Sequence, residues 1–193
     1  MNKIQLIYAD LPYRFGSKQY QDGNRDFKKI SYVTMSQKEM ESIRVKDIVA
    51  DDAVCFIWTP KSRIIDASNV MKSWGFKFVT IAFYWEKKTS KGNTCYNFAP
   101  TTLSSMECVI YGTRGKVSKF KQCNNVKDKL DDERTIHSRK PNEARDRIDK
   151  LFGKLNKVEF FATQNIWENS WGYDIDDKSV EQHIESMILA NDK

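Results

Sequence analysis

The sequence predicts an α/β fold with three layers, in which helices cover both faces of a mostly parallel β-sheet. Short apolar runs of strand length alternate along the chain with segments that carry apolar residues at helical spacing. The first run, residues 4–8, is apolar throughout, as expected for a strand that is buried on both faces of a sheet. Such alternation is typical of parallel sheets. A chain of 193 residues suits one domain, so we predict a single domain over residues 1–193.

Residues 36–49 and 53–59 predict the first helix and the second strand. Ser36 and Glu39 have the S-x-x-E spacing of a capping box, and apolar residues follow at helical spacing. Residues 53–59 form a continuous apolar run, which Pro60 ends.

The next helix and strand lie on either side of Gly75. Apolar residues at helical spacing predict a helix over residues 61–74, and glycine commonly ends a helix. Residues 76–85 are rich in β-branched and aromatic residues, which predicts a strand. Two long polar stretches, residues 14–35 and 86–104, interrupt this pattern. Loops of that length are usually functional or disordered, so we expect both to line the functional site.

The second half of the chain predicts two further strands and two further helices. Residues 106–111 form an apolar strand. Pro141 suits the first turn of a helix that runs to Phe152. Residues 158–162 predict the last strand, and residues 176–190 predict a C-terminal helix with one apolar side.

The composition argues against several classes of protein. No apolar run approaches the roughly 20 residues that cross a bilayer, so we expect no membrane association. The N-terminal apolar run is too short for a signal peptide, which indicates an intracellular, cytoplasmic protein. Only two histidines are present, His137 and His183, and no cysteines have C-x-x-C spacing, which argues against a metal site. Cys55 and Cys108 lie inside apolar runs and are expected to be free buried thiols.

The net charge of +6 arises in one segment of the chain. Residues 114–157 carry 14 Lys and Arg against 7 Asp and Glu, whereas all other residues together carry 18 against 19. Two interpretations are open. The segment is either a basic face that contacts solvent, or a surface that binds the phosphates of a polyanion such as nucleic acid.

Polar residues follow four of the predicted strands, at the edge of a parallel sheet where binding sites gather. They are Asp10-Leu11-Pro12-Tyr13, Pro60-Lys61, Glu86-Lys87-Lys88 and Thr163-Gln164-Asn165. Glu107 and Glu159 lie inside apolar strands, where a buried carboxylate needs a partner.

The tetrapeptide Asp10-Leu11-Pro12-Tyr13 has two interpretations. One is a turn in which an acid ends the strand and Pro12 has a structural role. The other is a site for the exocyclic amine of adenine, a poor nucleophile because its lone pair is delocalised into the ring. The Asp10 carboxylate and the Leu11 carbonyl would accept the two N–H groups and position the nitrogen for in-line attack. Tyr13 would stack on a base that has left its helix.

The tetrapeptide and several further elements occur in the order that characterises one enzyme family. Along the chain they are D-L-P-Y at residues 10–13, Y-V-T-M-S at 32–36, F-I-W at 56–58, W-G-F at 74–76, W-E-K at 85–87, Glu107 at the start of a strand, H-S-R-K-P at 137–141, V-E-F-F-A at 158–162 and W-G at 171–172. Over residues 4–175 the chain therefore resembles the MT-A70 family of adenine-N6 methyltransferases. This family includes the catalytic subunit of the eukaryotic messenger-RNA methyltransferase and many phage and bacterial DNA enzymes.

The resemblance implies a Rossmann-like class I methyltransferase fold with a permuted motif order, and S-adenosylmethionine as the cofactor. It implies direct methyl transfer to the adenine amine, with Asp10, Leu11, Pro12 and Tyr13 as the catalytic residues. The residues that it implies at the cofactor are Asp10, Lys140, Glu159, Thr163, Asn165, Tyr173 and Asp174. The residues predicted to contact nucleic acid are Tyr32, Lys87, Lys88, Arg114, Lys116 and Arg139.

Four positions depart from the family's pattern. Leu11 replaces the first proline of D-P-P-[YW], which keeps the carbonyl but loses rigidity. Tyr13 stands where close relatives have tryptophan, and either ring can stack. Thr163 stands where relatives often have arginine, and Tyr173-Asp174 stands where Asn-Gln or Asn-Glu is common.

The resemblance leaves alternatives for substrate and assembly. DNA is the expected substrate because the compact chain looks most like the phage and bacterial branch, with RNA as the alternative. Because Leu11 departs from the pattern, a non-catalytic nucleic-acid-binding partner subunit is a further alternative, although the retained Asp10 argues against it. Small adenine methyltransferases often pair, so we expect a homodimer or a partner subunit.

Several motif residues also have a purely structural interpretation. Trp58, Trp74 and Phe76 are expected to lie in the core rather than in the site. Lys140, without the resemblance, fits an ordinary exposed lysine, and His137 and Tyr32 lack any independent sign of a role.

Overall fold

The structure is a computed structural model that describes residues 3–14, 33–98, 101–131, 139–163, 165–167, 169–172 and 178–191. Its strands are β1 (Ile4–Asp10), β2 (Val49–Pro60), β3 (Lys77–Glu86), β4 (Asn97–Phe98), β5 (Leu103–Ser104), β6 (Met106–Arg114), β7 (Lys129–Leu130), β8 (Lys157–Phe160) and β9 (Ser170–Trp171). Its helices are α1 (Gln37–Ser42), α2 (Val45–Ile48), α3 (Ile64–Ser73), α4 (Asn142–Phe152) and α5 (Val180–Asn191), with the 3-10 turns η2 (Lys61–Arg63) and η3 (Ser118–Phe120).

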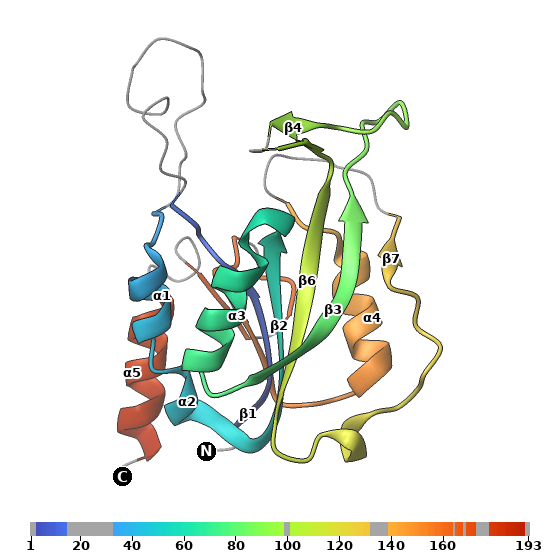
Figure 1. Ribbon diagram of the computed structural model, residues 1–193. Coiled ribbons are helices and arrows are strands. Elements are labelled where there is room, and N and C mark those ends of the chain that lie inside the picture. Colours follow the sequence, from blue (N-terminus) through green and yellow to red (C-terminus); the bar gives the residue numbers. More distant parts are fainter. Residues whose placement is uncertain are drawn as a thin grey trace.

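Seven strands form a central sheet in the order β7-β3-β6-β2-β1-β8-β9 (Figure 1). Neighbouring strands are parallel except at β6, which is antiparallel to both β2 and β3. Strands β1, β2, β3 and β8 therefore all end at one edge of the sheet, where β6 begins. We call this edge the carboxyl edge, and the opposite one the far edge. The mostly parallel sheet that the sequence predicts is confirmed.

Helices pack on both faces of the sheet, which confirms the three layers. Helices α1, α3 and α5 lie on one side and α4 lies on the other (Figure 1). Alternate residues of β2 enter the two cores: Cys55 and Ile57 face one, and Phe56 and Trp58 face the other. A strand covered on both faces must be apolar at every position, which explains its continuous apolar run.

The predicted core tryptophans are confirmed. Trp58, Trp74 and Phe76 are all buried, and burial of side chains of this size contributes roughly 2–3 kcal/mol each. The indole Nε1 of Trp74 donates to the carbonyl oxygen of Met40 at 2.9 Å, so its polar atom is satisfied. Cys55 is also buried, as expected.

The helix predicted over residues 36–49 is wrong in its length, although its start is confirmed. The Ser36 Oγ accepts from the Glu39 N–H at 3.3 Å, and a Glu39 carboxylate oxygen accepts from the Ser36 N–H at 2.6 Å. The helix ends at Ser42 because Ile43 is extended, with φ −60° and ψ 127°.

The break at Ile43 has a packing reason. Ile43, Val45 and Ile48 are all buried. In one continuous helix, at about 100° per residue, Ile43 would point away from the other two. Interrupting the helix lets all three enter one core, and it lets β2 begin at Val49, four residues before the predicted strand.

Some strand ends also differ from prediction. Strand β8 ends at Phe160, because Phe161 has a φ of +61° that no strand accommodates. The short strands β4, β5, β7 and β9 are too brief to leave a periodic signal. Among the described residues, no helix is both long enough and apolar enough to cross a membrane.

Candidate active site

Four charged side chains meet at the carboxyl edge: Asp10, Lys87, Glu107 and Lys140. We call them the edge cluster. The Lys140 Nζ lies 2.7 Å from the Asp10 Oδ2 and 3.4 Å from the Glu107 Oε2, and Lys87 donates to the other Glu107 oxygen. They come from the end of β1, the end of β3, the start of β6 and the turn before α4.

The antiparallel direction of β6 brings Glu107 into the cluster. In the sheet register Glu107 pairs with Pro60 of β2 on one side and with Trp85 of β3 on the other. If β6 were parallel to its neighbours, its first residues would lie at the far edge. The glutamate that opens this strand therefore reaches the same edge as the residues that follow the other strands.

Burial and charge oppose each other in the cluster. Burial raises the pKa of the Asp10 carboxyl above its ordinary value, and the Lys140 ammonium only partly offsets this. Burial also acts to raise the pKa of Glu107, but the ammonium groups of Lys140 and Lys87 outweigh it and hold that pKa below the ordinary value. The pKa of Lys140 is raised, because the two carboxylates outweigh its desolvation. Lys140 therefore stays charged.

Asp10 is the most accessible member of the edge cluster. Its side chain is 32% exposed, whereas those of Lys140, Glu107 and Lys87 are 14%, 17% and 16% exposed. The other three side chains are therefore largely covered, and the Asp10 carboxylate is the group that a ligand can contact most easily.

Residues of the Y-V-T-M-S element hold the tetrapeptide in place. Met35 donates its N–H to the Pro12 carbonyl oxygen at 2.8 Å and accepts from the Arg14 N–H at 3.1 Å. The Leu11 side chain is buried, and its carbonyl oxygen accepts the Tyr13 N–H at 2.9 Å. A carbonyl oxygen has two lone pairs, so this bond leaves capacity for a second donor.

Tyr13 is fixed in the wall of the site. Its side chain is buried, and its hydroxyl lies 3.1 Å from the Thr59 Oγ1 at the end of β2. The Arg63 guanidinium lies 5.4 Å from the centre of the ring. Burial raises the pKa of the Tyr13 hydroxyl, so this group stays neutral. The sequence did not point to Thr59 or Arg63, since neither falls in a recognised element.

A second buried ion pair supports β8 beneath the edge. Both Glu159 oxygens accept from the Arg145 guanidinium of α4, one of them at 3.0 Å. Arg145 in turn lies 5.1 Å from the ring centre of Tyr8, whose hydroxyl accepts from the Trp58 Nε1. Sequence analysis missed Arg145. The available signal was Glu159, a carboxylate in an apolar strand that required a partner.

The predicted cofactor residues fall into three groups. Asp10 and Lys140 form an ion pair in the edge cluster, and Glu159 is bonded to Arg145. Thr163 and Asn165 are exposed just beyond the end of β8, at the same edge. Residues 173 and 174 lie outside the described part of the chain.

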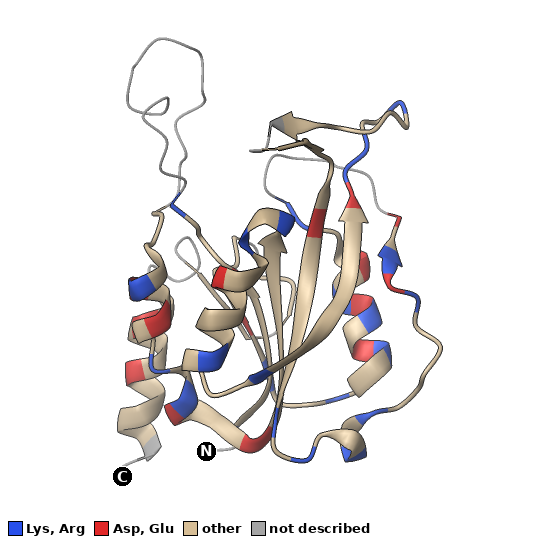
Figure 2. Cartoon of the chain, in the orientation of Figure 1, with Lys and Arg blue, Asp and Glu red and all other residues tan. Residues whose placement is uncertain are grey.

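The predicted nucleic-acid residues do not come together. Lys87, Lys88 and Arg139 lie at the carboxyl edge, whereas Arg114 and Lys116 lie at the far edge. Figure 2 shows basic positions at both ends of the sheet. The prediction for Tyr32 falls outside the described residues.

The far-edge residues are engaged with their surroundings. Arg114 ends β6, donates to the Lys46 carbonyl oxygen at 3.4 Å and lies 3.9 Å from Asp51. The Lys116 N–H donates to the Asp52 carboxylate at 2.7 Å. The basic residues of this segment that the structure describes are thus not gathered on one surface: Arg114 and Lys116 lie at the far edge, and Arg139 and Lys140 lie at the carboxyl edge.

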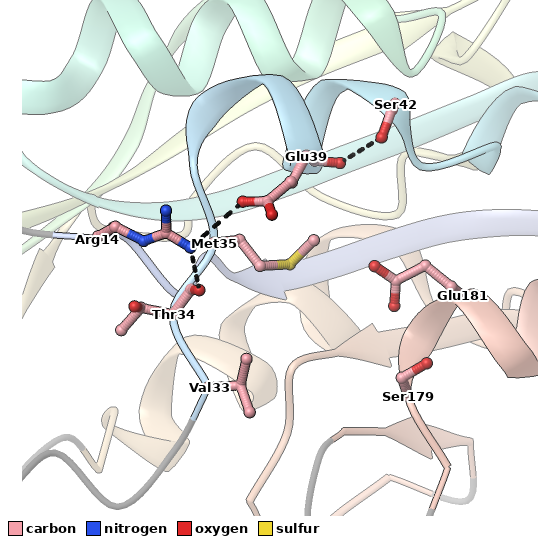
Figure 3. A pocket seen from close by; sticks show the side chains of 8 residues that line it. All are labelled: Arg14, Val33, Thr34, Met35, Glu39, Ser42, Ser179 and Glu181. Carbon is pink, nitrogen blue, oxygen red and sulfur yellow. Dashed lines mark hydrogen bonds and ion pairs between the residues drawn. The ribbon is translucent and has the colours of Figure 1, made fainter.

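A surface pocket of about 420 Å³ lies beside the tetrapeptide. Figure 3 shows Arg14, just after Tyr13, reaching across it to Glu39 and to the Thr34 carbonyl oxygen. Its lining residues are Arg14, Val33, Thr34, Met35, Glu39, Ser42, Ser179 and Glu181. None of the four members of the edge cluster lines this pocket. Among the described residues, no group of three or more His, Cys, Asp or Glu could hold a metal ion.

Two comparisons with known proteins identify the family of the chain. The chain is 34% identical to the Type II methyltransferase M.MunI from Mycoplasma sp over an alignment of 205 residues, which covers 98% of this chain and 85% of that protein. It also matches the MT-A70 family over residues 4–174, a span that runs from the start of β1 to beyond β9 and includes every member of the edge cluster. The chain therefore belongs to the MT-A70 family.

Proposed function

We propose that the chain is an S-adenosylmethionine-dependent methyltransferase that methylates the N6 amine of adenine in DNA. The observation that carries the proposal is Asp10, a partly exposed carboxylate at the end of a buried strand, held by Lys140 at 2.7 Å. Family membership supports the reaction type.

The tetrapeptide offers the two acceptors that an aromatic amine needs. The Asp10 carboxylate accepts one N–H of the adenine amine, and the free lone pair of the Leu11 carbonyl accepts the other. These bonds orient the nitrogen and draw its electron density out of the ring. The raised pKa of Asp10 makes it a better acceptor for the proton that the amine loses. Tyr13 and Pro12 shape the surface against which the base lies.

The edge cluster fits the amino-acid end of S-adenosylmethionine. This end is a zwitterion, and the adjacent Asp10 and Lys140 present a carboxylate to an ammonium and an ammonium to a carboxylate. When bound, the cofactor supplies an electrophilic methyl group on a sulfonium. Thr163 and Asn165, beyond β8, are proposed to bind its nucleoside end. The other residues proposed to bind the cofactor are Glu159, Tyr173 and Asp174.

One observation favours DNA as the substrate: the relative that aligns with 98% of this chain is named a Type II methyltransferase. Lys88 and Arg139 add positive charge at the carboxyl edge, which suits the phosphates of either nucleic acid. We place the reaction in the cytoplasm of a bacterium or of a phage-infected host, with the enzyme as a homodimer or with a partner subunit.

The decisive experiment is methyl transfer by the purified protein. We expect label from S-adenosylmethionine to appear in DNA that lacks adenine methylation, and mass spectrometry of its nucleosides to identify N6-methyladenine. Asp10→Ala should lower the rate by about 100-fold or more, as loss of a key electrostatic contact does. Asp51→Ala is the matched control, because this aspartate is 99% exposed at the far edge. It should keep full activity.

Each other outcome has a definite meaning. Label in RNA alone would identify an RNA adenosine methyltransferase. No label in either nucleic acid, with no cofactor binding by calorimetry, would leave a non-catalytic nucleic-acid-binding subunit. A fully active Asp10→Ala would refute the role assigned to this carboxylate.

A further inference from the structure

Residues 87–98 and 101–105, between β3 and β6, form an arm at the carboxyl edge (Figure 1). We call these residues the hairpin arm. Residues 87–95 form its first turn, in which the Cys95 N–H donates to the Lys87 carbonyl oxygen at 2.7 Å and Lys88 forms a β-bridge with Thr94. The antiparallel pair of β4 and β5 follows. The arm therefore has a defined backbone that can present side chains to a ligand.

One contact joins the arm to the active site, and two further contacts hold the arm in place. Lys87, at its base, is part of the edge cluster through Glu107. The Lys87 N–H donates to the Ser105 carbonyl oxygen at 2.9 Å, and the Lys61 Nζ lies 3.5 Å from the Thr102 Oγ1. Four residues of chain span at most about 14 Å, so Leu103 lies within that distance of Glu107.

The arm exposes two large apolar side chains. Tyr96 is 61% exposed and Leu103 is 55% exposed. Leu103 lies in β5 and pairs with position 98 of β4, and Tyr96 directly precedes β4. Both exposed side chains therefore belong to the same short stretch of the arm, and we call them the apolar tip.

Positive charges accompany this apolar tip. Lys88, Lys91 and Lys61 lie on or beside the arm, and the tip of its first turn is basic (Figure 2). Aromatic and apolar groups next to cations match a nucleic acid, whose bases stack while its phosphates need positive charge. An arm of this kind fits a base step flanked by phosphates.

We propose that Tyr96 and Leu103 enter duplex DNA and fill the space left when the target adenine is extruded toward Asp10, while Lys88 and Lys91 bind the flanking phosphates. The inference rests on the proposed function and names duplex DNA as the substrate. A base inside a duplex cannot reach the edge cluster, and its extrusion costs a few kcal/mol of lost stacking and pairing. An apolar wedge recovers part of that cost, as it does when side chains enter base steps. A single strand requires no such wedge.

The test compares native and heat-denatured forms of the same DNA. In the variant that combines Tyr96→Ala with Leu103→Ala, kcat/KM on native DNA should fall by about 10-fold or more, while kcat/KM on denatured DNA stays near the wild-type value. The control combines Ile65→Ala with Leu189→Ala, two strongly exposed side chains outside the arm. It should leave the ratio of the two rates unchanged.

A second readout follows extrusion itself. Once the methylated sequence is mapped, 2-aminopurine in place of the target adenine should brighten when wild-type protein binds the duplex, and brighten less with the double variant. Circular dichroism checks that both variants are folded.

Two outcomes would overturn the inference while leaving the proposed function intact. One is an unchanged ratio of native to denatured rates in the double variant, whether both rates are kept or both fall by the same factor. The other is a wild-type protein that methylates only denatured DNA. A wild-type protein that methylates neither form contradicts the proposed function itself.

Discussion

Lys140 is the residue on which the electrostatics of the site depend. It lies between two carboxylates that would otherwise repel each other, and its own burial is offset by their charge. The Trp58 ring lies 5.7 Å from its ammonium, adding a cation–π contact. Glu107 is then held by Lys140 on one side and Lys87 on the other, and we propose that it positions Lys140 against Asp10.

The lowered pKa of Glu107 predicts a pH-dependent contribution to stability. A carboxyl whose pKa is lower in the folded state stabilises the fold above its ordinary value of 4.5, and this contribution is lost as the pH falls through the folded value. Glu107→Gln leaves two nearly buried ammonium groups without this partner, so at pH 7 we expect a loss of about 3 kcal/mol in unfolding free energy. The gap to wild type should narrow below pH 4.5.

Urea unfolding of both proteins from pH 7 to pH 3 measures this gap. Glu185→Gln, on an exposed acid of α5, should match wild type throughout. A difference in unfolding free energy that stays constant with pH would show that the two lysines do not lower the pKa of Glu107 in the folded state.

At the scale of elements, a close approach of the two backbones just after the parallel strands β8 and β9 shapes the proposed cofactor side of the site. A Cβ on Gly172 would lie 1.7 Å from the Ala162 carbonyl oxygen, so only glycine allows the two backbones to approach. The Ala162 N–H donates to the Trp171 carbonyl oxygen at 3.1 Å, next to the positive φ of Phe161. The W-G element thus has a packing reason: it sets the path of the chain toward Thr163.

Substitution of Gly172 should disturb both stability and cofactor binding. Gly172→Ala forces the backbone after β8 to move, so we expect a loss of about 3 kcal/mol in unfolding free energy. Calorimetry should show weaker binding of S-adenosylmethionine. Gly92→Ala is the control, because no atom lies within 4 Å of its added Cβ.

The control should lose only about 1–2 kcal/mol, the cost of its positive φ, and should bind the cofactor normally. If Gly172→Ala kept wild-type stability and affinity, the close approach of the backbones at Gly172 and Ala162 would not matter for the site.

At the scale of the whole molecule, the basic residues divide between the two ends of the sheet. Arg114 lies seven residues along β6 from Glu107, a separation of about 23 Å. A phosphate backbone seated over the carboxyl edge would meet Lys88, Lys91 and Arg139 directly. The far-edge residues would meet it only if the nucleic acid curved around the molecule.

This division predicts how DNA binding responds to salt. Each lost phosphate contact lowers the slope of log affinity against log salt concentration by about 0.9. We expect a variant with Lys88, Lys91 and Arg139 replaced by alanine to lower the slope by about 2–3, because it removes up to three contacts. Replacement of Arg114 and Lys116 should leave the slope unchanged.

Fluorescence anisotropy measures the affinity for duplex DNA at salt concentrations from about 50 to about 200 mM, and these affinities give the slopes. An equal decrease in the far-edge variant would bring Arg114 and Lys116 back into the interface that the sequence predicts.

The sequence by itself determined the layered α/β fold, the order of its elements and the family to which the chain belongs. These features have local causes. Apolar periodicity reports which faces of a segment are buried, a capping box starts a helix at Ser36, and motif order needs no coordinates. The edge to which Asp10 belongs follows from the direction of β1 in a parallel sheet.

The tertiary structure alone decided which charges pair. Asp10 and Lys140 are 130 residues apart, and Glu107 reaches them only because β6 runs antiparallel to its neighbours. Arg145 finds Glu159 because α4 packs on the face below β8. Ion pairing depends on distances of a few ångströms between distant segments. Strand register and direction set these distances, and neither leaves a mark on local sequence.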